Sequence, residues 1–155
     1  ALVMQTSIGQ GDTLVTPMEM ALIASAVAND GEMIKPRYVD NIVSADGQAV
    51  KTFYKESLGT VMSESEANTL TELMKGVVQR GTAVSLSDLP YNIAGKTGTA
   101  EHGSDGETPH SWFVGFSNAD DPDIVIAVVA ENGGYSSEVA VPIARQVIEA
   151  YYAQQ

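Results

Sequence analysis

The chain of 155 residues contains no cysteine, which excludes a disulfide framework and a thiolate nucleophile. Its 8 Lys and Arg stand against 20 Asp and Glu, and a formal net charge of -12 repels the phosphates of nucleic acids. With only 2 His, the chain has few metal ligands beyond carboxylates, so the sequence predicts neither a metal site nor a cofactor. No apolar run reaches the roughly 18 to 20 residues that cross a membrane.

Three helices are predicted from capping signals and apolar periodicity. Thr16 and Ser63 each open a capping box, with helices expected over residues 17–29 and 63–81, and a third is expected over residues 139–152. The helix over residues 17–29 is apolar on nearly every face, which is typical of a helix packed all round. In this chain alone we expect part of that surface to lie bare and to promote self-association.

The remaining pattern predicts strands, so the expected fold class is α+β, an antiparallel sheet flanked by helices. A hairpin is expected around Asp46-Gly47, because a two-residue turn with positive φ at both positions favours this dipeptide. Three further strands are expected over residues 91–101, 111–117 and 124–131. The last is almost entirely apolar and is therefore predicted to be a central strand covered on both faces. Trp112 is expected to be a core residue rather than a sugar platform.

The most informative run is AGKTGTAE, residues 94–101, where a lysine, two hydroxyls and two glycines share one predicted strand. A phosphate-binding loop would need glycine where Pro90 stands, and a helix after the lysine, so that interpretation fails. The run also matches the Lys-Thr-Gly strand of serine enzymes that handle penicillins. Taken alone, three letters are equally compatible with a solvated lysine between turn glycines on an edge strand.

Six other short motifs accompany this run in a fixed order. They are Ser7-Ile8-Gly9-Gln10-Gly11, Thr16-Pro17 with Met20-Ala21, Ala28-Asn29-Asp30-Gly31, Gly81-Thr82-Ala83, Trp112-Phe113-Val114-Gly115-Phe116 and Glu131-Asn132-Gly133-Gly134. From about residue 7 to residue 152 the chain resembles the C-terminal half of the transpeptidase domain of penicillin-binding proteins, whose fold is shared with β-lactamases.

This resemblance implies roles for four residues of the run. Lys96 would be a catalytic residue that helps to bind the carboxylate of the substrate or of a β-lactam and tunes the proton network, and the hydroxyls of Thr97 and Thr99 would donate to that carboxylate. The backbone amide of Thr99 would supply half of an oxyanion hole. Gly98 has no side chain and lets a ligand approach the strand closely. Alternation places Lys96 and Gly98 on one face and both threonines on the other, which leaves open how they reach one ligand.

The family's nucleophile, a serine three residues before a lysine, is absent from residues 1–155, and so is its Ser-x-Asn element. We therefore expect residues 1–155 to be an incomplete, C-terminal portion of a transpeptidase domain, with the serine half upstream or in another chain. This chain alone is expected to be inactive. The parent is expected outside the cytoplasmic membrane, anchored by an N-terminal segment that these residues do not include.

The function implied is part of a peptidoglycan DD-transpeptidase, which binds penicillin and cross-links stem peptides ending in D-Ala-D-Ala through a serine acyl-enzyme. The expected partners are a stem peptide or β-lactam and the upstream half of the same domain. A fragment of a β-lactamase or β-lactam sensor, and a catalytically dead binding module of the same fold, are the alternatives. Near the run, residues 102–110 with His102 and His110 lack metal-site spacing and are expected to form a polar loop at the mouth of the cleft.

Overall fold

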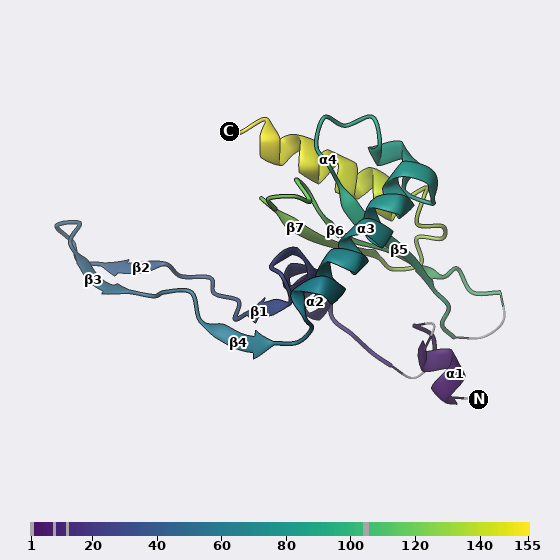
Figure 1. Ribbon diagram of the computed structural model, residues 1–155, viewed down its shortest axis with the longest axis horizontal. Helices are drawn as coiled ribbons and strands as arrows, with labels where there is room; N and C mark the ends of the chain where they lie inside the picture. Colours follow the sequence, from purple (N-terminus) through teal and green to yellow (C-terminus); the bar gives the residue numbers. More distant parts are fainter. Residues whose placement is uncertain (1, 8, 12, 104–105) are drawn as a thin grey trace.

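The computed structural model describes residues 2–7, 9–11, 13–103 and 106–155, which form an α+β arrangement (Figure 1). Its elements in chain order are α1 (Leu2–Ser7), α2 (Pro17–Ala28), β1 (Glu32–Ile34), β2 (Asn41–Val43), β3 (Ala49–Thr52), β4 (Ser57–Thr60), α3 (Glu64–Arg80), the 3-10 turn η1 (Val84–Leu86), β5 (Ala94–Ala100), β6 (His110–Phe116), β7 (Val125–Ala130) and α4 (Ala140–Tyr152). The predicted α+β class is confirmed. Within the described residues no helix has the length and apolarity needed to cross a bilayer.

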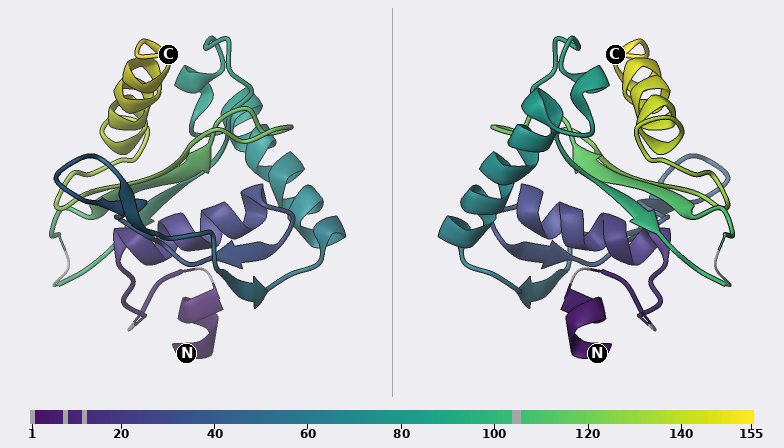
Figure 2. Two further views of the ribbon diagram at one scale, coloured as in Figure 1. Left: turned by 90° about the vertical axis from the view of Figure 1, so that its left-hand side faces the viewer. Right: turned by 90° about the vertical axis from the view of Figure 1, so that its right-hand side faces the viewer.

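The main sheet has three antiparallel strands in the order β5-β6-β7, with α4 against one face and α2 against the other (Figure 2). Alternation divides the core between the two faces. Phe113 of β6 and Ile126 of β7 pack with Ile148 of α4, whereas Phe116 of β6 packs with Val27 of α2. Each face therefore receives alternate side chains of the same strands, as expected for a sheet covered on both sides.

The prediction that residues 124–131 form a strand covered on both faces is confirmed, but its central position is not found among the described residues. β7 lies at the edge of the described sheet, and β6 is the middle strand. The apolar run has another cause, since α2 and α4 contact β7 from opposite faces. Covering both faces is enough to require apolar side chains on a strand, whatever the number of its neighbours in the sheet.

α2 begins and ends as its sequence predicts. The Thr16 hydroxyl accepts from the Glu19 N–H, and the Glu19 carboxylate accepts from the Thr16 N–H at 2.7 Å. The chain leaves the helix through two left-handed residues, Asp30 at φ 54° and Gly31 at φ 90°. A Cβ on Gly31 would lie 2.0 Å from the carbonyl oxygen of Met62, so this close approach needs glycine.

A helix that is apolar on nearly every face is expected to be packed all round, but part of the surface of α2 is exposed. Ala24, Ala26 and Val27 are buried, but the side chains of Met18 and Ile23 are 40% and 46% exposed. Part of the helix surface is thus bare in this chain, as expected. Whether that surface drives self-association stays a prediction.

The hairpin around Asp46-Gly47 is present and projects away from the body of the molecule as β2 and β3 (Figure 1). Its turn differs from the prediction. The Gly47 N–H donates to Ser44 O at 3.0 Å and the Ser44 N–H to Gln48 O at 2.9 Å, which makes a three-residue turn. Only Gly47 has positive φ there, since positive φ among the described non-glycine residues is confined to Asp30, Asn118 and Asn132. A three-residue turn needs just one left-handed position, and glycine fills it.

A second strand pair, β1 with β4, carries this hairpin and was not predicted. Each strand is short, and no apolar alternation marks it in the sequence. The pairing arises because the hairpin returns the chain to the end of α2, where the Val61 N–H donates to Gly31 O at 2.9 Å. Gly31 therefore contacts the residues between β4 and α3, which hold the returning chain against the end of α2.

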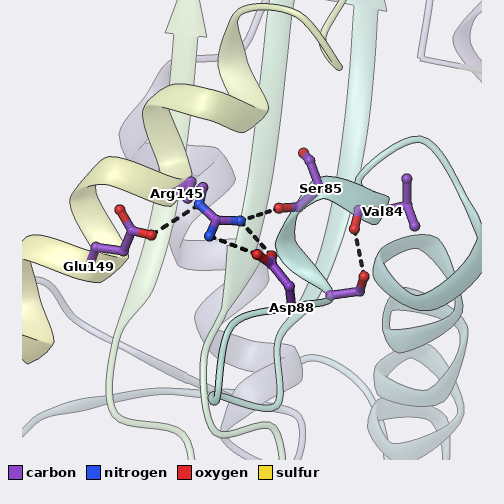
Figure 3. Close-up of polar contacts among 6 residues, drawn as sticks. Val84, Ser85, Asp88, Arg145 and Glu149 are labelled. Carbon is purple, nitrogen blue, oxygen red and sulfur yellow. Dashed lines mark hydrogen bonds and ion pairs between the residues drawn. The ribbon is translucent and has the colours of Figure 1, made fainter.

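Arg145 of α4 ties that helix to η1 (Figure 3). Its guanidinium holds Asp88 through two bonds, from Nη1 to Oδ1 at 2.5 Å and from Nη2 to Oδ2 at 3.0 Å. Nη1 also donates to the Ser85 carbonyl at 2.5 Å, and Nε to Glu149 Oε1 at 3.0 Å. The hydrogen bond from Arg145 lowers the pKa of the Asp88 carboxyl. Such a bidentate pair fixes geometry as well as charge.

This pair predicts a pH-dependent contribution to stability. Because the pKa of Asp88 is lowered on folding, its contribution is complete above the unfolded value of about 3.9 and is lost as pH falls through the lower folded value. Asp88→Asn should therefore unfold at a lower urea concentration than wild type at neutral pH, with the difference closing as pH falls below the unfolded value of about 3.9. Urea titrations across pH check this, with Asp121→Asn as the exposed control. A difference that stays constant with pH would contradict it.

Candidate functional site

The backbone of β5 faces an open edge at alternate residues. Among the described residues β5 is an outer strand of its sheet, and β6 is the one strand that pairs with it. The Ser117 N–H donates to Ile124 O at 3.1 Å, which directs the peptides of odd-numbered β6 residues towards β7 and those of even-numbered residues towards β5. In β5 the partners of Val114 and Trp112 are Lys96 and Gly98. The N–H and C=O groups of the residues between, Thr97 and Thr99, therefore point to the open edge.

Side chains already meet the two carbonyls at this edge. Lys96 Nζ donates to Thr97 O at 2.6 Å, and Gln10 Nε2 donates to Thr99 O at 3.0 Å. Both contacts agree with the direction that the strand pairing gives to these carbonyls. Since the N–H and C=O of one strand residue point to the same side, the Thr99 N–H faces this edge as well.

Lys96 is an exposed cation in a chain of net charge -12. Its side chain starts from the face opposite to Thr97 and reaches the open edge, where Nζ meets the Thr97 carbonyl. Among the described residues no carboxylate forms an ion pair with it, whereas Lys35, Arg37, Lys75 and Arg145 all have acidic partners. An ammonium without a carboxylate, beside an outward N–H, can bind an anionic group.

The two threonine hydroxyls lie on the other face of β5, and each bonds another side chain. Thr97, which is only 8% exposed, places Oγ1 2.5 Å from the Thr82 Oγ1. Thr99 places Oγ1 3.1 Å from the Ser136 Oγ. Lys96, Thr97, Gly98 and Thr99 thus share one strand segment, with the ammonium and the outward peptides at its edge and the hydroxyls behind it.

Two glycines of the run have different packing reasons. A Cβ on Gly95 would lie 2.5 Å from the ring of Phe113, so glycine lets this core ring lie against the strand. A Cβ on Gly98 would meet only the Trp112 Cβ, at 3.3 Å, which is a tighter but smaller contact. Gly95 is therefore required by the core. The environment of Gly98 is compatible with its expected role in close ligand approach.

Three polar residues at β5 were given no role by sequence reasoning: Gln10, Thr82 and Ser136. Gln10 and Thr82 lie in short motifs that the sequence singled out, but their bonds to Thr99 and Thr97 cross 89 and 15 residues of chain. Ser136 follows the Gly133-Gly134 pair and carries no local signal at all. Contacts of this range depend on tertiary packing, so only the arrangement of motifs could have suggested them.

The connection between β5 and β6 brings the two histidines together. The rings of His102 and His110 stack with centroids 3.8 Å apart. His102 Nε2 bonds the Thr108 carbonyl at 3.0 Å, and the Asn132 N–H donates to His110 Nδ1 at 3.0 Å. Within the part of the chain that the structure describes, no three His, Asp or Glu residues gather as metal ligands would.

The open edge of β5 forms one wall, not an enclosed site. A polar hollow of about 550 Å³ lies on the other side of the fold, between the end of α2, α3 and the β6–β7 turn, and Thr71, Glu72 and Asp120 line it. Another, on the outer face of α3, is lined by residues such as Asn68 and Leu73. Neither of these two hollows contains a residue of β5.

Comparison with known proteins agrees with this arrangement. The sequence model of the penicillin binding protein transpeptidase domain matches residues 2–149. The chain is 37% identical to the peptidoglycan D,D-transpeptidase PbpA of Mycolicibacterium smegmatis and 38% identical to that of Mycobacterium tuberculosis, over 94% of the chain in both cases. It spans only 31% of the length of each of these relatives.

Solved structures give the same result. Penicillin-binding protein A from M. tuberculosis, as its ceftriaxone acyl-enzyme complex, superposes with a TM-score of 0.86 at 36% identity, covering 94% of this chain and 34% of that one. Pseudomonas aeruginosa PBP2 in complex with WCK 5153 superposes with a TM-score of 0.81 at 33% identity, covering 97% of this chain and 33% of that one.

The bond between Thr82 and Thr97 predicts a coupled pair of substitutions. Thr82→Val leaves the nearly buried Thr97 hydroxyl without its partner and should lower the free energy of unfolding by about 1 kcal/mol. Thr82→Val with Thr97→Val should cost less than the sum of the two single changes, because no polar group then loses a partner. Urea unfolding of the four proteins measures this coupling, and strictly additive effects would rule it out.

Proposed function

Because this chain belongs to the penicillin-binding protein transpeptidase domain family, we propose that it forms the C-terminal part of a peptidoglycan D,D-transpeptidase. The observation that carries the proposal is the open edge of β5, where the Lys96 ammonium and the outward Thr99 peptide lie together. The family supplies the nucleophile from a Ser-x-x-Lys motif, which residues 1–155 lack. We place that serine, its lysine and the Ser-x-Asn element on an upstream segment of the same protein.

The chemistry proposed at this edge is acyl transfer. The serine gives its proton to the neighbouring lysine of its motif, and its oxygen attacks the carbonyl carbon between the two D-alanines of a stem peptide. The C–N bond then breaks, and the terminal D-alanine leaves with that proton on its amine. An amine of a second stem peptide then attacks the ester and restores the serine. In both steps negative charge develops on the carbonyl oxygen. The Thr99 N–H stabilises that oxyanion together with a donor from the upstream segment.

Lys96 and the threonines act on the end of the substrate. The ammonium of Lys96 binds the terminal carboxylate of the stem peptide, or the equivalent carboxylate of a β-lactam, in a protein that otherwise repels anions. Thr97 and Thr99 are the expected hydroxyl donors to the same group. Each hydroxyl would have to exchange its present partner, Thr82 or Ser136, for the ligand. Gly98 between them leaves the strand accessible.

The proposal extends to partners and place. Lys96 and Thr99 form one wall of a cleft, so the upstream half of the domain is the obligatory partner that supplies the other wall. Acting on peptidoglycan, the parent would work outside the cytoplasmic membrane, held by an N-terminal anchor upstream of these residues. A β-lactam would occupy the same site as a covalent inhibitor.

The first prediction concerns where penicillin reacts. A fluorescent penicillin should label the protein that contains the upstream segment and leave the 155-residue chain unlabelled, because the chain has no Ser-x-x-Lys. Gel fluorescence and intact mass together measure the adduct. Labelling of the chain alone would reveal a nucleophile within these residues. If neither protein were labelled, the proposed acyl transfer would fail and a binding module of the same fold would be favoured.

The second prediction concerns the charge at position 96. In the protein with its upstream segment, Lys96→Gln should reduce the second-order rate of penicillin acylation by roughly 10- to 100-fold, the value of a charge-assisted hydrogen bond. Lys35→Gln is the matched control, since Lys35 is exposed and pairs with Glu56 beside the β1–β4 strand pair. Equal rates for Lys96→Gln and wild type would remove Lys96 from the site.

A further inference from the structure

We propose that Ser136 is a positioning residue that fixes the peptide between Gly98 and Thr99, and so holds the Thr99 N–H in the direction needed to stabilise an oxyanion. Ser136 lies in the connection between β7 and α4, 38 residues beyond Gly98, and touches neither the substrate nor the open edge in the arrangement described above. The inference rests on the proposed function, because it concerns the same acyl transfer.

The first observation is the direction of the Ser136 hydroxyl. Its Oγ lies 2.8 Å from the Gly98 carbonyl oxygen, which can only accept, so the single Ser136 proton is donated there. Thr99 Oγ1 lies 3.1 Å from the same Ser136 Oγ and must be the donor in that second bond. Ser136 is 5% exposed, so water has little access to these bonds.

The second observation is which peptide this hydroxyl holds. The Gly98 carbonyl and the Thr99 N–H belong to one planar trans peptide unit and point in opposite directions. The strand pairing turns the Gly98 carbonyl towards Trp112 of β6, and the Ser136 hydroxyl adds a second donor to the same oxygen. A carbonyl held by two donors resists rotation of its peptide plane. The N–H on the far side of the plane is then held towards the open edge.

The third observation is that Ser136 is itself held in place. The Asn132 N–H donates to His110 at 3.0 Å and the Gly134 N–H donates to Pro109 O at 2.9 Å, which ties the connection to the start of β6. The Val141 N–H donates to the Ser136 carbonyl at 2.9 Å and ties it to α4. Ser136 therefore transmits the rigidity of β6 and α4 to the edge strand.

This restraint matters because β5 is an edge strand with a glycine at the critical peptide. Glycine has more conformational freedom than any other residue type, and within the described residues no strand lies on the far side of β5. Oxyanion donors work only when they are preorganised at about 2.7–3.1 Å from the developing charge. The sheet restrains this peptide only through β6. The Ser136 hydroxyl adds a second hydrogen bond to the same carbonyl and so helps to preorganise the Thr99 N–H.

The Thr99 hydroxyl is held by the same serine. While it donates to Ser136 it presents only lone pairs in other directions, so it can donate to a ligand carboxylate only after it has exchanged this partner for the ligand. In this state Thr99 acts through its backbone amide. The Ser136 hydroxyl thus separates the two expected functions of Thr99.

The test uses the protein with its upstream segment and a penicillin that forms a stable acyl-enzyme. Ser136→Ala should slow the acylation step roughly tenfold, less than the 100- to 1000-fold typical of deleting an oxyanion donor, because the Thr99 amide is loosened and not removed. Affinity before acylation should not fall, because the Thr99 hydroxyl loses its partner Ser136 and is free to donate to the ligand carboxylate. The infrared band of the acyl ester carbonyl should move to higher frequency, since weaker hydrogen bonds polarise it less. Ser136→Thr, which keeps the hydroxyl, should restore both readouts, and Ser137→Ala is the exposed neighbouring control.

The outcomes separate the two proposals. A slower acylation step with a shifted carbonyl band in Ser136→Ala, both restored in Ser136→Thr, supports the positioning role. Wild-type acylation and an unshifted band in Ser136→Ala overturn it. Slow acylation with an unshifted band overturns it too, because that result describes general damage to the fold. If the wild-type protein forms no acyl-enzyme, the proposed function itself fails and this inference falls with it.

Discussion

An outer antiparallel strand pairs on one side only, so every second peptide unit must point away from the sheet, and in β5 these units include Thr97 and Thr99. The rest of the site depends on that constraint. It gives the edge an outward N–H at Thr99 and outward carbonyls at Thr97 and Thr99, which Lys96 and Gln10 meet. The same alternation buries the Thr97 side chain behind the strand, where Thr82 holds it. In this short run the outward backbone groups thus line the open edge, and the threonine side chains bond to the residues behind the strand.

An edge strand is hydrogen-bonded to a neighbouring strand on one side only. Its position therefore depends more strongly on packing against its two faces and on side-chain hydrogen bonds. Phe113 lies against Gly95 on the face of the sheet that α4 covers, α2 covers the other face at β6 and β7, and α3 contacts β5 itself. Arg145 joins α4 to η1, the short turn that directly follows Thr82 and Ala83. Ser136 lies in the connection that precedes the same helix, and its carbonyl accepts from the Val141 N–H of that helix. Both hydroxyl contacts of β5 therefore lead back to α4, although no residue of this helix reaches the open edge.

Charge decides what such an edge can hold. Most of the surface is acidic, with a net charge of -12, so an anionic ligand gains nothing from the protein as a whole. The Lys96 ammonium, free of carboxylate partners among the described residues, is a local exception at an edge where outward peptides are available. This combination supports the proposed function, in which the ligand ends in a carboxylate and its carbonyl oxygen becomes an oxyanion during acyl transfer.

The amino-acid sequence by itself determined the local structures whose signals are contiguous: the capping boxes at Thr16 and Ser63, the left-handed exit at Asp30 and Gly31, and the strand character of the Lys-Thr-Gly run. The order of its motifs also determined the family. The sequence did not determine that β7 lies at an edge, since apolar side chains report covered faces and not neighbouring strands. Nor did it determine the contacts of Thr82, Gln10 and Ser136 with β5, because each joins segments far apart in the chain. Only tertiary packing brings those groups within hydrogen-bond distance, and only strand pairing decides which peptides of β5 face outward.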